Sequence, residues 1–158
     1  MSEQRRAVID RFTGPHAFLS NFYPCRVTFN GMTFPSVEAA FQAAKCADPK
    51  DRTRFLTLEP AQAKRLGRRV KMRPDWDARK LTIMHNLLVH KFEENPDLVP
   101  KLLDTGGAVL VEGNTWHDNF WGCCTCAQCG GQHGRNNLGR LLMRLRAEYM
   151  SRVGGTSL

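Results

Sequence analysis

The sequence has no long apolar segment and few acidic residues for its length. Among its 158 residues, no apolar run approaches the roughly 20 residues that are needed to span a bilayer. Residues 1–6, M-S-E-Q-R-R, lack the apolar core of a secretion signal. We therefore expect a cytoplasmic protein with no membrane partner and with reduced cysteine thiols. Internal repeats and low-complexity segments are also absent, which favours a single domain over residues 1–158.

Basic side chains outnumber the acidic ones. The 23 Lys and Arg residues against 15 Asp and Glu residues give a formal net charge of +8 and a pI near 9.5. This balance favours an anionic partner, which means a nucleic acid, a nucleotide or a sugar phosphate. Much of the excess falls within residues 64–73. A solvated helix face is the plain alternative explanation for that stretch.

Residues 36–45, S-V-E-A-A-F-Q-A-A-K, predict a short helix with a file of polar side chains. Ser36 is a favoured N-cap, and the alanines that follow favour helix. Glu38, Gln42 and Lys45 then stand at i, i+4 and i+7, so they share one face. The pattern fits either a surface ion pair on an amphipathic helix or a polar cleft that contains an acid, an amide and an amine.

Turn and helix signals elsewhere predict an α+β fold that is mainly helical around a small β-sheet. A hairpin is expected across residues 26–34, where an Asn-Gly pair suits a type I′ turn. The longest helical pattern covers residues 76–95, with Leu81 on its inner stripe. The last helix, which begins near residue 136, should carry Arg146 on its outer face.

Residues 116–121, W-H-D-N-F-W, place Asp118 among aromatic side chains. Two indoles and a phenyl ring suit a pocket that stacks a planar base and sets a carboxylate beside it. The alternative is a core aromatic cluster in which Asp118 caps the turn that follows it.

Residues 122–134 form a loop that is rich in cysteine and glycine. Cys124, Cys126 and Cys129, followed by two glycines, are similar to a zinc knuckle, in which backbone amides face the thiolates. The candidates for a fourth ligand are Cys123, His117 and His133. No open coordination position is implied, so a zinc ion here would be structural. A loop of free thiols is the alternative.

Several stretches occur together in an order and spacing typical of one family. They are S-N-F at 20–22, F-P-S-V-E-A-A-F-Q-A-A-K at 34–45, R-P-D-W at 73–76, K-F at 91–92, A-V-L-V-E at 108–112, H-D-N-F-W-G at 117–122 and G-R-N-N-L-G-R-L-L-M-R-L-R at 134–146. From about Phe18 to Arg146 the chain resembles the NADAR superfamily, which includes the bacterial YbiA-like N-glycosidases. The cysteine-containing insertion before residue 134 departs from the compact YbiA-like loop.

The resemblance implies cleavage of an N-glycosidic bond at the anomeric carbon of a phosphorylated ribose, with no cofactor required for catalysis. Family members act on phosphoribosylamino-pyrimidine intermediates of riboflavin synthesis or on ADP-ribose attached to guanine bases of nucleic acid. We expect Glu38 to stabilise the ribose cation and to orient the attacking group, and Asp118 to be the second carboxylate. Lys45 is the third catalytic residue, and either its amine or a water molecule attacks the anomeric carbon. The expected substrate-binding residues are Asn21, Gln42, Trp76, Trp121, Arg135 and Asn136, with phosphate held by Arg68, Arg69 or Arg135.

Two non-catalytic functions are also compatible with this sequence. A nucleic-acid-binding module would use the basic stretch and the cysteine loop, and its affinity would fall steeply with salt. An ADP-ribose-binding module would hold the product tightly without turnover. The nucleic-acid-binding module does not account for the acid, amide and amine on one helix face.

Overall fold

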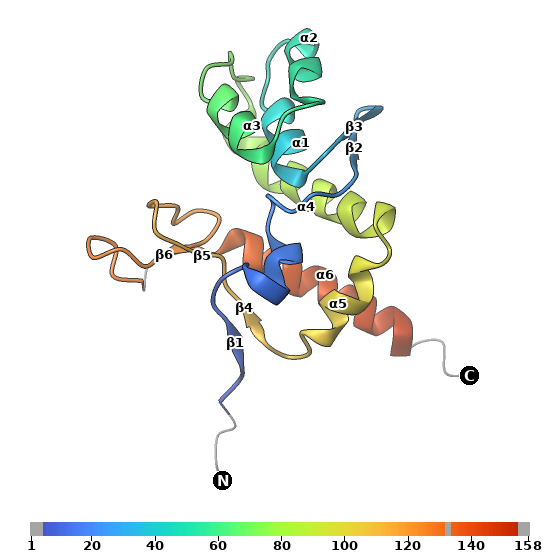
Figure 1. Cartoon of the computed structure of the whole chain (residues 1–158), viewed down its shortest axis with the longest axis vertical. Helices are drawn as coiled ribbons and strands as arrows, with labels where there is room; N and C mark the ends of the chain where they lie inside the picture. The colour runs from blue at the N-terminus through green and yellow to red at the C-terminus, as the bar shows by residue number, and fades with distance from the viewer. Residues whose placement is uncertain (1–4, 132–133, 155–158) are drawn as a thin grey trace. The chain divides into compact units, whose positions relative to one another are not determined.

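Two units of the chain fold around separate cores in the computed structural model, which describes residues 5–131 and 134–154. The central unit is Asn21–Asp97, and the terminal unit is formed by Met1–Ser20 together with Leu98–Leu158 (Figure 1). The expectation of one domain over residues 1–158 stays a prediction.

The central unit begins with the hairpin that the Asn-Gly pair predicts. Strand β2 (Val27–Phe29) runs antiparallel to β3 (Met32–Phe34). Asn30 and Gly31 between them have φ angles of 48° and 78°, and a type I′ turn requires positive values at both positions. The predicted hairpin is therefore confirmed.

Helix α1 (Val37–Ala44) lies at the centre of this unit and contacts its other helices. The Ser36 hydroxyl accepts a hydrogen bond of 3.0 Å from the amide of Ala39, as an N-cap does. Small alanine side chains allow close approach, and α1 packs against α3 and α4 (Figure 1). The remaining helices of the unit are α2 (Pro49–Arg52), the 3₁₀ helix η2 (Thr53–Phe55), α3 (Pro60–Gly67) and α4 (Trp76–Glu94).

Helix α4 buries most of its predicted stripe, with one error in the prediction. Met84, Leu87 and Leu88 are buried, but Leu81 is 43% exposed. Periodicity identifies the face of a helix but not the turns at which another element covers it. Lys91 is fully buried on the same helix, with its ammonium group 5.8 Å from the centre of the Tyr23 ring. Burial lowers the pKa of Lys91 to about 8.

The terminal unit combines short strands with two helices. Strand β1 (Val8–Ile9) pairs in parallel with β4 (Val109–Leu110), and β5 (Gly113–Asn114) pairs in parallel with β6 (Cys123–Cys124). The helical elements are the 3₁₀ helix η1 (Gly14–Leu19), α5 (Leu98–Asp104) and α6 (Asn137–Gly154). Its core contains fully buried leucines from three elements, which are Leu98 and Leu102 of α5, Leu110 of β4, and Leu138 and Leu142 of α6.

Arg146 of α6 is buried, so the prediction that it lies on the outer face is wrong. Its guanidinium group donates hydrogen bonds of 2.8 Å to the Thr105 hydroxyl and to the carbonyl of Ala108. A cation can be buried when its donors are satisfied in this way.

The α+β class with a mainly helical content is confirmed. Within residues 5–131 and 134–154, the strands form three separate two-stranded sheets, so the single small sheet of the prediction is divided. In the same ranges, none of the helices combines the length and the apolar content that a membrane span requires.

Candidate active site

The polar file that the sequence predicts on α1 starts with a buried carboxylate. Glu38 is 8% exposed, and its Oε1 accepts a hydrogen bond of 2.9 Å from Nε2 of Gln42, one turn later. This burial is inconsistent with a surface ion pair. Glu38 also stands in the first turn of α1, near the positive end of the helix dipole.

Lys45 follows α1 as its C-cap and points to the end of α3. Its Nζ donates a hydrogen bond of 2.7 Å to the carbonyl of Gly67. Burial lowers the pKa of Lys45, the charges of Cys46 and Glu38 oppose this shift, and Arg68 adds to it. A lowered pKa increases the fraction of neutral amine, which is the nucleophilic form.

Two buried side-chain oxygens next to Glu38 have no protein partner. The backbone carbonyl of Asn21 accepts the amide of Glu38 at 3.0 Å, and Asn21 is 7% exposed. Within the described part of the chain, Oδ1 of Asn21 and Oε1 of Gln42 are buried without a hydrogen-bond partner. Such acceptors are costly in a folded protein and are expected where a ligand supplies the missing donors.

Gly67 contributes to this site although its sequence position did not single it out. A Cβ atom at Gly67 would lie 1.9 Å from Oε1 of Gln42, so only glycine leaves that amide in place. The carbonyl of the same residue accepts the Lys45 amine. A glycine at the end of a helix is usually interpreted as a terminator, and only the contact with α1 reveals this role.

Trp76 lies against α1 in the core of the central unit. It is 6% exposed, and its ring centre is 4.8 Å from that of Phe41 at an interplanar angle of 50°. Most of the indole surface already contacts protein. Its role in stacking a substrate base stays a prediction.

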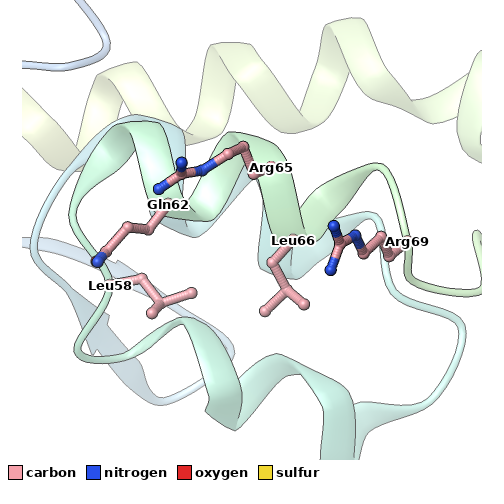
Figure 2. A pocket seen from close by; sticks show the side chains of 5 residues that line it. All are labelled: Leu58, Gln62, Arg65, Leu66 and Arg69. Carbon is pink, nitrogen blue, oxygen red and sulfur yellow. The ribbon is translucent and has the colours of Figure 1, made fainter.

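A pocket of about 400 Å³ lies beside α3, where it is lined by Arg65 of that helix and by Arg69, which follows it (Figure 2). Its lining residues are Leu58, Gln62, Arg65, Leu66 and Arg69. The guanidinium groups stand beside two leucine side chains, which suits a phosphate attached to a less polar group. Arg69 is one of the predicted phosphate-binding residues, whereas Arg65 was not selected. Gly67 lies on another face of α3, against Gln42, so this pocket is separate from the polar file.

The terminal unit holds Asp118 in a tight turn. One carboxylate oxygen, Oδ1, accepts the amides of Phe120 at 3.1 Å and Trp121 at 2.9 Å. The turn-capping alternative is therefore present in the structure, and a catalytic role for Asp118 stays a prediction. The rings of Phe120 and Trp121 meet edge to face with centres 4.8 Å apart, and the role of Trp121 in stacking is likewise untested.

Two asparagines that the sequence did not single out organise this loop. Asn114 is 4% exposed, and its Oδ1 accepts the amides of Trp116 at 3.3 Å and Asp118 at 3.1 Å. Its Nδ2 donates to the carbonyl of Asp118 at 2.8 Å. Asn119 Oδ1 accepts the amide of Cys124 at 2.9 Å. Asparagines that bind backbone groups a few residues away in a loop leave no periodic pattern in the sequence.

Arg135 and Asn136 also belong to the terminal unit. The Arg135 guanidinium group lies 6.0 Å from the centre of the Phe120 ring. The Asn136 amide accepts from the backbone of Glu112 at 3.0 Å and donates to the carbonyl of Leu110 at 2.8 Å. Both ends of Asn136 are thus used within the protein, and the predicted substrate contacts of these two residues stay predictions.

The three predicted cysteine ligands gather around one histidine. The ligand atoms of His117, Cys124, Cys126 and Cys129 all lie within 4.8 Å of one another. Cys123 is not part of this group, because its thiol donates to the carbonyl of Gly134 at 3.6 Å. His133, the other candidate for a fourth ligand, lies outside the described residues.

Comparison with protein families identifies the chain. The NADAR domain model matches residues 10–150, which is most of the sequence. The chain belongs to the NADAR domain family.

Relatives of this NADAR chain include proteins of similar length. N-glycosidase YbiA of Escherichia coli is 39% identical over 132 residues, which are 82% of this chain and 79% of the relative. N-glycosidase Npun_R5314 of Nostoc punctiforme is 33% identical over 150 residues, which are 91% and 92% of the two chains. The NMR structure of E. coli YbiA matches with a TM-score of 0.75 and 31% identity, covering 95% of this chain and 92% of that one.

Other relatives are considerably longer. Riboflavin biosynthesis protein VVA0006 of Vibrio vulnificus is 40% identical over 136 residues. The chain spans 35% of the length of that protein and 23% of the length of the maize riboflavin biosynthesis protein PYRR. The predicted superfamily and fold class are confirmed, and the names of the relatives of similar length support the N-glycosidase class.

Proposed function

We propose that this NADAR chain is an N-glycosidase that hydrolyses the bond between a base nitrogen and the anomeric carbon of a phosphorylated ribose. The observation that carries the proposal is the buried Glu38 carboxylate, which shares a helix with Gln42 and Lys45. The names of YbiA and Npun_R5314 support the same reaction class.

Glu38 stabilises the positive charge that develops on the ribose ring as the C–N bond breaks. A buried carboxylate is effective in this role, because a low local dielectric strengthens its interaction with a nearby cation. The unpaired oxygens of Asn21 and Gln42 accept hydrogen bonds from ribose hydroxyl groups, which supply the donors that the protein lacks.

Lys45 acts as the nucleophile in this proposal. Its neutral amine forms a bond to the anomeric carbon while the bond to the base nitrogen breaks, and the departing nitrogen takes a proton from water. The ring then opens to a Schiff base, which water hydrolyses to release the sugar and the free amine. The half-buried position of Lys45 favours this step through the lowered pKa of its amine.

The substrate that we favour is ADP-ribose attached to guanine bases of nucleic acid. The net charge of +8 and the pocket that Arg65 and Arg69 line supply more cations than a single phosphate needs. The second candidate is a phosphoribosylamino-pyrimidine intermediate, which the names of VVA0006 and PYRR favour. No cofactor takes part in either reaction. The free cysteines of the described chain suit the reducing cytoplasm and a structural zinc ion in the cysteine loop.

The decisive experiment offers both substrate classes to the protein and detects the released base and sugar by mass spectrometry. We expect Glu38→Gln and Lys45→Ala each to lower kcat by at least about 10³-fold without unfolding the chain. Matched controls are Glu93→Gln and Lys50→Ala, which change exposed residues of the same unit.

Borohydride added during turnover tests the covalent step. A sugar adduct is expected on wild-type protein and not on Lys45→Ala. Full activity of both site variants would end the assignment of α1 as the active site, and tight binding of ADP-ribose without turnover would favour a binding module.

A further inference from the structure

We propose that His117, Cys124, Cys126 and Cys129 form a zinc site of the Cys₃His type, with Nδ1 of His117 as the fourth ligand, and that the ion holds the turn of Asp118 in place. Nδ1 of His117 lies 3.4 Å from the sulfurs of Cys126 and Cys129 and 3.9 Å from that of Cys124. A tetrahedral zinc ion with bonds of about 2.3 Å to sulfur and about 2.0 Å to nitrogen sets N–S separations near 3.5 Å. The distances from Nδ1 to the Cys126 and Cys129 sulfurs therefore already match this spacing, and the Cys124 sulfur lies somewhat farther away.

The chemistry of the four ligands indicates which metal ion binds and what role it has. Three thiolates and one imidazole are soft and borderline ligands, and their tetrahedral arrangement is typical of zinc. Four protein ligands leave no coordination position for water or substrate, so the ion is structural. Magnesium and calcium prefer oxygen ligands, and no carboxylate belongs to the cluster within the described residues.

Hydrogen bonds to the sulfurs complete the site. The amide of His117 donates to the Cys124 sulfur at 3.3 Å, and Nδ2 of Asn119 donates to the Cys129 sulfur at 3.4 Å. Three thiolates around a zinc ion carry a net negative charge, which such donors stabilise. His117 has a φ of 68°, an uncommon value for a residue other than glycine, and this conformation aims its ring at the three sulfurs.

The ion also fixes the segment that carries Asp118, and this part of the inference rests on the proposed function. The ligands His117 and Cys124 flank the segment on both sides, and Asp118 binds the amides of Phe120 and Trp121 within it. Metal coordination at both flanks removes freedom from the turn between them. Loss of zinc therefore displaces the Asp118 carboxylate and the Trp121 ring together.

Metal content of the full chain tests the site directly. After reconstitution with zinc and desalting, we expect one zinc per chain by elemental mass spectrometry. His117→Ala and Cys126→Ser should weaken zinc binding by more than about a hundredfold. The matched control is Cys123→Ser, which removes a cysteine next to Cys124 but outside the cluster and should keep the metal.

Cobalt(II) binding to the wild-type chain keeps the test independent of how the variants fold. A tetrahedral site with three thiolates gives intense visible bands and a sulfur-to-cobalt charge-transfer band, and these should disappear when zinc is added. Absence of the bands, zinc content below about a tenth of an equivalent, or equal loss of zinc in Cys123→Ser and Cys126→Ser would overturn the site.

Amide hydrogen exchange separates this inference from the proposed function. Exchange at Phe120 and Trp121 should become at least about tenfold faster after chelation, whereas the amides of α1 serve as an internal control. Unchanged exchange at Phe120 and Trp121 would overturn the positioning role. A chain that binds zinc but releases no base would contradict the N-glycosidase and leave the metal site standing. A chain that turns over substrate with no zinc bound would contradict the metal site alone.

Discussion

The polar file of α1 and the loop from Gly113 to Gly131 hold their functional side chains in different ways. On α1, the helix repeat alone sets Glu38 and Gln42 one turn apart, and close packing buries Glu38 and the Oε1 atom of Gln42. In the loop no repeat exists, and Asn114 and Asn119 fix the backbone through hydrogen bonds. A helix tolerates the loss of one side chain, whereas a hydrogen-bonded loop loses several contacts with one substitution. Removal of a side chain should therefore change catalysis alone on α1, but should change both catalysis and stability in the loop.

Among the changes that compare these two regions, Asp118→Asn should have the largest effect, and it tests whether Asp118 has a chemical role beyond its turn. Asp118→Asn keeps an oxygen that can accept the amides of Phe120 and Trp121, but it cannot give a proton to a departing base. We expect kcat to fall by about 10²- to 10³-fold with an unchanged melting temperature. Asp118→Ala should lose activity and also loop order. Full activity of Asp118→Asn would leave Asp118 with a structural role only.

Asn114→Ala tests most directly whether the hydrogen bonds of the loop stabilise the protein. Asn114→Ala removes the acceptor for two amides and a donor to the Asp118 carbonyl in a buried position. We expect the free energy of unfolding to fall by about 2–4 kcal/mol, measured by urea denaturation of the full chain. Asn86→Ala, at an exposed position of α4, is the matched control. An effect no larger than that of the control would contradict the organising role of Asn114.

Gly67→Ala, at the end of α3, should act on α1 indirectly by displacing the side chain of Gln42. The new methyl group displaces the Gln42 amide from Glu38, and the flexible end of that side chain can move at small cost in stability. We expect kcat/KM to fall by roughly 10- to 100-fold, as for Gln42→Ala, with little change in melting temperature. The double variant Gly67→Ala/Gln42→Ala should lose no more of its kcat/KM than either single variant. Both substitutions remove the same hydrogen bond between Gln42 and Glu38. Gly107→Ala, at a site with open space, is the control.

The smallest expected effect is a shift in the pH profile of Arg68→Gln. Arg68 contributes to the lowered pKa of Lys45, so its removal raises that pKa. Because the neutral amine is the reactive form, kcat/KM rises with pH through this pKa, and the rising limb should move to higher pH. Arg26→Gln serves as the control. A shift to lower pH would contradict the electrostatic origin of the lowered pKa.

The parts that could be predicted from the sequence depend on residues close to one another along the chain. The hairpin, the N-cap at Ser36 and the face shared by Glu38 and Gln42 follow from turn chemistry and helical period. The family resemblance added the candidate roles that composition alone does not reveal.

The parts that could not be predicted depend on distant contacts. Gly67 meets Lys45 across 22 positions of sequence, and Arg146 finds its acceptors 38 and 41 positions away. Periodicity placed Leu81 on a buried stripe, yet burial at that turn requires a covering element. His117 likewise lies beside the three cysteines because its backbone has a positive φ angle, and the residue types of the loop do not predict that angle.

The buried ammonium group of Lys91 has a consequence for handling the protein. In the unfolded chain a lysine keeps its proton up to about pH 10.4, whereas in the fold the pKa of Lys91 is about 8. Between these values the unfolded chain binds a proton that the native chain has released, so resistance to denaturation increases as the solution becomes more alkaline. As far as Lys91 is concerned, a mildly basic buffer is therefore the better storage medium. Acidification toward neutrality protonates the buried amine and lowers the free energy of unfolding.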